Sequence, residues 1–175
     1  VVVHGINPVH SDLDPLCRDL VRRGYTVVRF SYDDGQRLDQ SAVRLRRAIA
    51  QLEQRWRPRR TAIVAHSMGG LVGRRALTTL PLALRRRGEA PVVLPPLSGR
   101  FELVTVASPF GGFRSANWSR LDLGLGRPVF RDLGSVSRFI RQPGDLIPGA
   151  THVKIETTEG GHERRNGESD SSVRL

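Results

Sequence analysis

A serine between small residues is the first feature of this chain that could do chemistry. Ser67 lies in Ala65-His66-Ser67-Met68-Gly69, after the apolar run 61–65 and before a stretch of helical period. A strand that turns directly into a helix brings the flanking backbone positions close together, so only small residues fit there. The central side chain is lifted clear of the sheet at a helix N-terminus, whose dipole favours negative charge. The pattern predicts a nucleophilic serine; the alternative is an ordinary serine N-cap.

Three segments resemble the α/β-hydrolase family, and more closely its lipase and esterase branches. They are residues 2–6, 64–72 and 106–112. The resemblance implies that the backbone amides of Ile6 and Met68 form an oxyanion hole. The residues agree, because Gly5 lets a loop approach the mouth of the sheet and Met68 begins the helix with its N–H unpaired. His4 and His66 are expected to be structural, since neither follows an acid in the serine, acid, histidine order of this family.

The acid and the base of a catalytic triad have two possible assignments. Asp170, three residues before Val173, resembles the acid loop of lipases and follows the predicted strand 152–158. This assignment places the general base beyond Leu175. The alternative pairs Asp145 with His162, which satisfies the family's chain order but lacks a convincing strand before Asp145.

The elements that must position these residues alternate between short β-branched runs and amphipathic stretches. This alternation predicts an α/β fold of the α/β-hydrolase type, with a mostly parallel sheet and helices on both faces. Asp14 is the expected N-cap of the first helix. Residues 81–100 are predicted to be a surface excursion and residues 113–132 to be irregular. The expected strands are 1–4, 25–32, 61–65, 101–107 and 152–158, and the expected helices are 14–24, 41–56, 68–77 and, weakly, 136–141.

Length and composition limit the classes of protein that remain. The 175 residues fit one domain, 1–175, which we expect to be truncated at both ends and to start at the strand before the His-Gly oxyanion loop. No apolar run approaches the roughly 20 residues that span a bilayer, although peripheral membrane contact remains possible. Cys17 is the only cysteine, which excludes an intramolecular disulfide and a cysteine-rich metal site. Cytosolic and exported locations both stay open.

The formal charge of +11 does not by itself indicate nucleic-acid binding. The arginines are scattered through the predicted helices instead of forming one basic tract, so no nucleic-acid partner is expected. The predicted function is hydrolysis of a small-molecule or lipid carboxylic ester through an acyl-enzyme intermediate, without metal or cofactor. The alternatives are a non-catalytic or truncated binding domain and a lipid-remodelling acyltransferase or deacylase.

Overall fold

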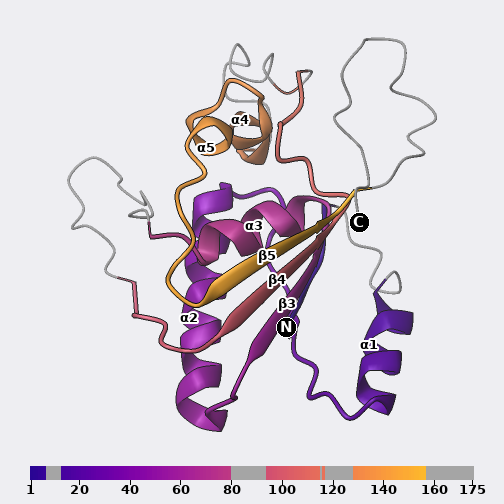
Figure 1. Cartoon of the computed structure of the whole chain (residues 1–175). Coiled ribbons are helices and arrows are strands. Elements are labelled where there is room, and N and C mark those ends of the chain that lie inside the picture. Colours follow the sequence, from indigo (N-terminus) through magenta and orange to yellow (C-terminus); the bar gives the residue numbers. More distant parts are fainter. Residues whose placement is uncertain (7–12, 80–93, 115, 117–127, 157–175) are drawn as a thin grey trace.

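The computed structural model describes residues 1–6, 13–79, 94–114, 116 and 128–156. Five strands form one sheet in the order β2-β1-β3-β4-β5, and every neighbouring pair is parallel (Figure 1). The strands are β1 (Val2–Val3), β2 (Arg29–Phe30), β3 (Thr61–His66), β4 (Phe101–Val106) and β5 (Ala150–Ile155). The predicted α/β class with a parallel sheet is therefore confirmed.

The parallel arrangement brings all carboxyl ends of the strands to one edge of the sheet. β1 lies beside β3, and β3 lies beside β4 over six paired residues from Thr61–Phe101 to His66–Val106. The segments that follow these three strands begin at His4, Ser67 and Ala107. The fold thus places the three segments that the sequence singled out next to one another.

Two helices cover one face of the sheet. α3 (Met68–Ala76) packs on β1, β3 and β4, and α2 (Leu38–Trp56) packs on α3. α1 (Asp14–Arg22) lies apart from them, beside the sheet (Figure 1). The core lies between the sheet and α3 and between α3 and α2. Its fully buried side chains include Leu38, Leu45, Ile49, Ile63, Leu77, Phe101 and Leu103.

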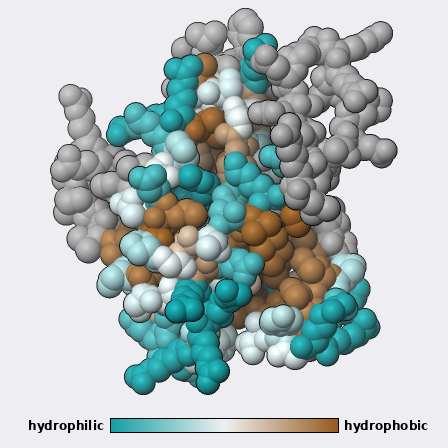
Figure 2. All heavy atoms as spheres, in the orientation of Figure 1, coloured by the Kyte–Doolittle hydropathy of each residue, from teal (hydrophilic) through white to brown (hydrophobic). Residues whose placement is uncertain are grey.

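The other sheet face, turned toward the reader in Figures 1 and 2, carries apolar side chains. Along β3 and β4, Val64 and Val104 alternate with the residues that face α3. On β5, Val153 and Ile155 are 47% and 39% exposed. This face is therefore apolar without being fully covered by the described residues.

The start of α2 differs from its prediction. The apolar spacing indicated a first residue near Ser41, whereas α2 begins at Leu38. The carboxylate of Asp132 accepts a hydrogen bond from the Leu38 N–H at 2.8 Å and so caps the helix from 94 residues away. Local periodicity contains no sign of such a cap. The end is as expected: Arg57 has a left-handed conformation (φ 44°) and Pro58 follows.

Three other predictions were wrong in part. Asp14 is not the N-cap of α1, because Leu13 occupies that position and makes no side-chain cap hydrogen bond. The strand predicted over 25–32 contains only Arg29–Phe30, since its partner β1 is itself two residues long. The region expected to be irregular contains α4 (Val129–Leu133), which is followed by α5 (Arg138–Arg141).

Candidate active site

Ser67 occupies the sharp turn between β3 and α3. Its backbone has φ 52° and ψ −128°, an uncommon conformation for any residue other than glycine. The Ser67 N–H donates to the carbonyl of Val106 at 2.8 Å, which ties the turn to the end of β4. A strained backbone that is held from a neighbouring strand presents the side chain at the carboxyl edge, which is the geometry expected of a nucleophile elbow.

Gly69 lies against the backbone of the first loop. A Cβ at this position would come within 2.4 Å of the His4 carbonyl oxygen and 2.8 Å of the Val3 carbonyl oxygen. Both are backbone atoms that cannot move aside without displacing β1. The small residue that the motif contains is therefore required by the close approach of α3 to the segment after β1.

His4 fixes the orientation of the peptide between Gly5 and Ile6. Its Nδ1 lies 2.7 Å from the Gly5 carbonyl oxygen, and its Nε2 accepts from the Tyr32 N–H at 3.3 Å. A carbonyl can only accept, so Nδ1 is the donor in this contact. The ring also stacks on Tyr32 at 4.3 Å between centroids. This supports the prediction that His4 is structural.

The same contact determines where the Ile6 amide points. In a trans peptide the carbonyl and the N–H project in opposite directions. Because His4 holds the Gly5 carbonyl, the Ile6 N–H is directed away from the imidazole. Met68 is the first residue of α3, so helix geometry leaves its N–H without an intrahelical partner. Ile6 and Met68 both line one pocket with Ser67.

That pocket has a volume of about 370 Å³. Its lining combines the three predicted site residues with apolar side chains from the segment after β4 and from α4. The lining residues are Ile6, Ser67, Met68, Pro109, Phe113, Ala116, Phe130 and Leu133. Among these described residues Ser67 alone has a polar side chain, and the volume falls in the range of small-molecule sites.

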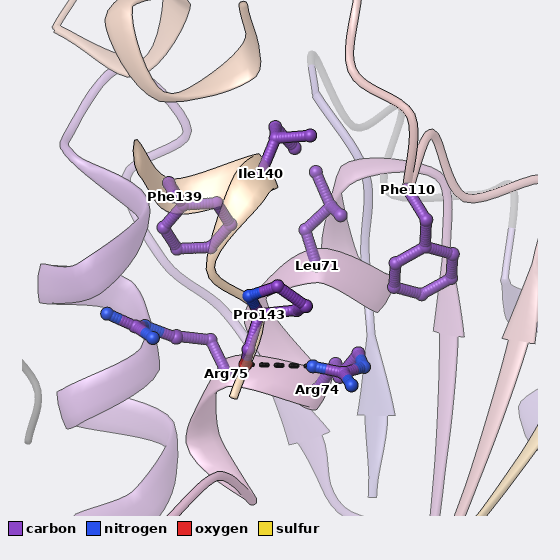
Figure 3. Close-up of a pocket in the computed structure, with 7 residues that line it drawn as sticks. All are labelled: Leu71, Arg74, Arg75, Phe110, Phe139, Ile140 and Pro143. Carbon is purple, nitrogen blue, oxygen red and sulfur yellow. Dashed lines mark hydrogen bonds between the residues drawn. The ribbon is translucent and has the colours of Figure 1, made fainter. Parts of the chain in front are cut away.

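A second, much smaller pocket lies on the outer side of α3 (Figure 3). Its volume is about 20 Å³, which is enough for about one water molecule. Arg74 crosses it and donates to the Pro143 carbonyl at 2.8 Å and to the Gly144 carbonyl at 3.0 Å. This pocket is a packing gap beside a structural arginine, so the larger pocket is the candidate site.

The structure describes only one of the two candidate triad acids. Asp170 and His162 lie outside the described residues. Asp145 is described, and its carbonyl accepts from the Thr79 N–H at 2.9 Å, beyond the C-terminal end of α3. A helix of nine residues is roughly 13 Å long. The structure therefore does not bring Asp145 to Ser67, which lies at the opposite end of the same helix.

His152 is another histidine in the described part of the chain, on β5. It lies on the face of β5 toward α3, with Nε2 2.9 Å from the Thr105 hydroxyl and its ring edge-on to Phe110. Burial, assisted by the positive charges of Lys154 and Arg74, lowers the pKa of His152 to about 4. A neutral imidazole held inside the sheet layer does not line the Ser67 pocket.

The sequence analysis missed the pocket wall formed by Phe113, Phe130 and Leu133. Phe130 and Leu133 belong to α4, a five-residue helix in a stretch that we expected to be irregular. Their spacing of three was the only available signal, and one pair of apolar residues is too short a pattern to indicate a helix.

The described residues contain no group of three or more His, Cys, Asp or Glu side chains that could hold a metal ion. No helix in the part of the chain that the structure describes has the length and apolar character needed to cross a bilayer.

Comparison with solved structures gives the same fold. The mature lipase BlEst2 from Bacillus licheniformis matches 89% of this chain with a TM-score of 0.63 and 16% identity, over 63% of its own length. The phospholipase PlaB from Legionella pneumophila, in complex with thio-NAD, matches 88% of this chain with a TM-score of 0.55 and 20% identity, over 36% of its length. The chain therefore spans less than two thirds of either neighbour.

Comparison at the sequence level identifies the family. A search of curated proteins found no sequence that matches the chain. The family model described as "Alpha/beta hydrolase family" matches residues 1–160, which is most of the chain. The parallel sheet and the solved neighbours agree with this match in fold. The chain belongs to the alpha/beta hydrolase family.

Proposed function

We propose that this chain carries the nucleophile and the oxyanion hole of a serine hydrolase that cleaves carboxylic esters. The observation that supports it best is Ser67 itself, with φ 52° at the turn between β3 and α3, lining a pocket together with Ile6 and Met68. The names of the solved neighbours, a lipase and a phospholipase, favour esters over other acyl derivatives.

The proposed reaction proceeds through an acyl-enzyme. The Ser67 Oγ attacks the ester carbonyl carbon while its proton passes to a general base, and the carbonyl oxygen becomes an oxyanion. The Ile6 and Met68 amides donate hydrogen bonds to that oxyanion. The C–O bond then breaks, the alcohol leaves with the proton, and water releases the acid from Ser67.

The pocket lining favours an uncharged, apolar acyl group. Among the residues that the structure describes, all lining side chains other than Ser67 are apolar, so a charged substituent there would be buried against apolar groups. Burying an unpaired charge costs several kcal/mol, whereas each buried methylene contributes about 0.8 kcal/mol. The substrate class that fits best is therefore an ester of an aliphatic acid.

Asp170 remains the proposed triad acid. β5 lies next to β4 and is parallel to it, so the chain leaves β5 at the same sheet edge as Ser67. Asp170 follows that end in the sequence, whereas Asp145 precedes β5. In the natural full-length protein, Asp170→Asn should lower turnover by about four orders of magnitude, as loss of a triad acid does. Loss of activity in His162→Ala with full activity in Asp170→Asn would reverse this assignment.

Covalent labelling tests the nucleophile directly. The natural full-length protein is treated with an alkyl fluorophosphonate, and the modified peptide is identified by mass spectrometry. We expect a single adduct on Ser67, and we expect it to be absent in Ser67→Ala and retained in Ser108→Ala, which removes the nearby serine after β4. An adduct on another serine, or hydrolysis that survives Ser67→Ala, would exclude the proposal.

A further inference from the structure

α4 contributes two side chains to one wall of the Ser67 pocket. Phe130 and Leu133 are three positions apart, so they lie on the same side of this short helix, and both line the pocket. Phe113, from the segment after β4, lines the pocket with them. The position of α4 therefore limits the length of a group that can enter the pocket past Ser67.

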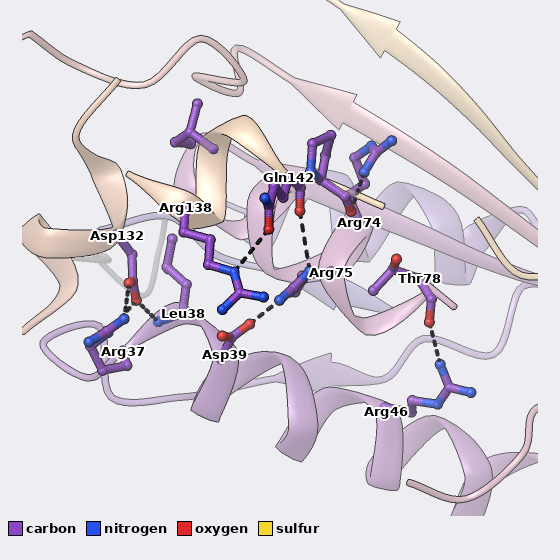
Figure 4. Close-up of polar contacts among 12 residues, drawn as sticks. Arg37, Leu38, Asp39, Arg46, Arg74, Arg75, Thr78, Asp132, Arg138 and Gln142 are labelled. Atoms are coloured by element: carbon purple, nitrogen blue, oxygen red, sulfur yellow. Dashed lines mark hydrogen bonds and ion pairs between the residues drawn. The ribbon is translucent and has the colours of Figure 1, made fainter. Parts of the chain in front are cut away.

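An ion pair between a buried carboxylate and a half-exposed arginine holds α4 against the start of α2 (Figure 4). Asp132 is 2% exposed, and its carboxylate lies 2.6 Å from Arg37 Nη2 and accepts from Arg37 Nε at 2.9 Å. The same carboxylate accepts from the Leu38 N–H. One side chain thus caps a 19-residue helix and fixes α4 to it, since Asp132 lies between Phe130 and Leu133 in sequence.

Backbone contacts hold the C-terminal side of α4 as well. The Leu133 carbonyl accepts from the Phe113 N–H at 2.8 Å, and the Phe113 carbonyl accepts from the Ser135 N–H at 3.3 Å. Gly112 has φ 71°, and a Cβ there would come within 2.8 Å of the Leu133 carbonyl oxygen. These backbone hydrogen bonds therefore connect two walls of the pocket, one from α4 and one from the segment after β4.

We propose that α4 is the chain-length selector of this site, with Phe130 and Leu133 as specificity residues and Asp132 as a positioning residue. The inference rests on the proposed ester hydrolysis at Ser67. A longer acyl chain is accepted only to the depth at which it meets Phe130 and Leu133, and Asp132 keeps both side chains in place without touching the substrate.

Shortening the wall residue tests the selector. Wild type and Phe130→Ala are compared on p-nitrophenyl esters of linear acids from two to twelve carbons, in the natural full-length protein. We expect the optimum of kcat/KM to move to longer chains in Phe130→Ala, with about a fourfold gain for each additional methylene that becomes buried. Phe139→Ala is the matched control, because Phe139 is a buried phenylalanine of α5 that does not line this pocket.

Variants of Asp132 test the positioning role. Asp132→Asn keeps one oxygen that can accept from Leu38, whereas Asp132→Ala keeps none. We expect selectivity between long and short esters to flatten more in Asp132→Ala than in Asp132→Asn, with kcat for the acetate ester changed less than twofold. A fall in kcat that is equal for every chain length would show a structural role only and would contradict the positioning proposal.

Binding without turnover separates this inference from the proposed function. Ser67→Ala and Ser67→Ala/Phe130→Ala are titrated with linear alkanols from butanol to decanol by ligand-observed NMR. Affinity that rises with chain length and extends to longer alkanols in the double variant supports the selector even if the wild type hydrolyses no ester. If the wild type hydrolyses esters but Phe130→Ala and Leu133→Ala leave the optimum unchanged, the selector is wrong and the hydrolase stands.

Discussion

At the scale of the residue, position 69 shows how closely two segments of the site approach each other. Alanine is favoured over glycine inside a helix by about 1 kcal/mol, yet a Cβ at Gly69 would meet the His4 and Val3 carbonyl oxygens. A Cβ at Gly73, one turn further along α3, would come within 3.0 Å of the Cδ1 of Leu103, which is the end of a flexible side chain. Gly69 and Gly73 therefore form a matched pair of positions at which to compare the effect of an added Cβ.

We predict that Gly69→Ala lowers the free energy of unfolding by about 1–3 kcal/mol, as overpacking does. Gly73→Ala is expected to change it by less than about 1 kcal/mol, because the gain in helix propensity offsets a small shift of Leu103. Urea unfolding of both variants measures the difference. Equal effects at the two positions would mean that β1 yields to the added carbon and that the approach of α3 is not tight.

His152 predicts how stability depends on pH. Its pKa is lowered to about 4, mainly by burial and then by the charges of Lys154 and Arg74. The unfolded chain binds a proton near pH 6.5, whereas the folded protein resists it until about pH 4, so the unfolded state binds more protons between these values. The free energy of unfolding should fall as the pH falls through this window. His152→Gln should flatten the fall, measured by urea unfolding at steps between about pH 7 and 4.

The comparison of wild type with His152→Gln isolates this one group, because His4 and His66 are present in both proteins. A wild type whose stability runs parallel to that of His152→Gln across this pH range would show that the imidazole titrates alike in the folded and unfolded states. Parallel curves would contradict the burial of His152 against Thr105.

At the scale of the element, Arg46 joins α2 to the end of α3. Its guanidinium donates to the carbonyls of Ala76 and Thr78 at 3.3 and 3.0 Å, and to Pro95 at 3.1 Å. Ala76 is the last residue of α3, so its carbonyl has no partner within the helix. Burial lowers the pKa of Arg46 below its usual range. The hydrogen bonds to the three carbonyls offset the free-energy cost of burying the charged guanidinium.

We predict that Arg46→Met destabilises the protein by roughly 2–4 kcal/mol, since it removes three hydrogen bonds that the guanidinium donates to backbone carbonyls. Arg47→Met on the exposed side of the same helix is the matched control and should change stability by less than about 0.5 kcal/mol. Thermal unfolding followed by circular dichroism compares them. Similar losses in both variants would assign the effect to helix propensity and would exclude a role in joining the helices.

The elements that were predicted well are those specified by their own residues. β3 and β4 are continuous apolar or alternating runs, and α2 repeats apolar residues every three or four positions over 19 residues. The errors concern elements specified from a distance. α2 starts earlier than its pattern indicates, and α4 forms in a stretch without helical periodicity, where Asp132 connects two segments 94 residues apart.

The same division applies to the candidate site. Ser67, Ile6 and Met68 follow from signals within a few residues of each strand end, and the parallel sheet then brings them to one pocket. The wall residues Phe130 and Leu133 carry no such local signal. Asp170 and His162 stay predictions, because both lie outside the described residues.

At the scale of the whole molecule, charge opposes folding. The chain carries 28 basic and 17 acidic residues, for a net charge of +11, and the ion pairs among the described residues involve few of the arginines. Like charges held on a compact surface repel one another more than on an expanded chain. This repulsion acts over long distances. Physiological salt, at which the Debye length is about 8–10 Å, therefore screens most of it.

We therefore predict that the melting temperature rises when sodium chloride is increased from about 10 mM to about 150 mM, over which the Debye length falls from roughly 30 Å to 8 Å. Arg44 and Arg47 are exposed on α2, and the double variant Arg44→Gln/Arg47→Gln reduces the charge without creating a new ion pair. It should melt higher than wild type at low salt, and the difference should shrink at high salt because screening removes the same repulsion. If the melting temperature of wild type falls with salt, attractive pairs such as Arg37–Asp132 and Arg75–Asp39 outweigh the net charge, and stability depends on those contacts more than on the overall field.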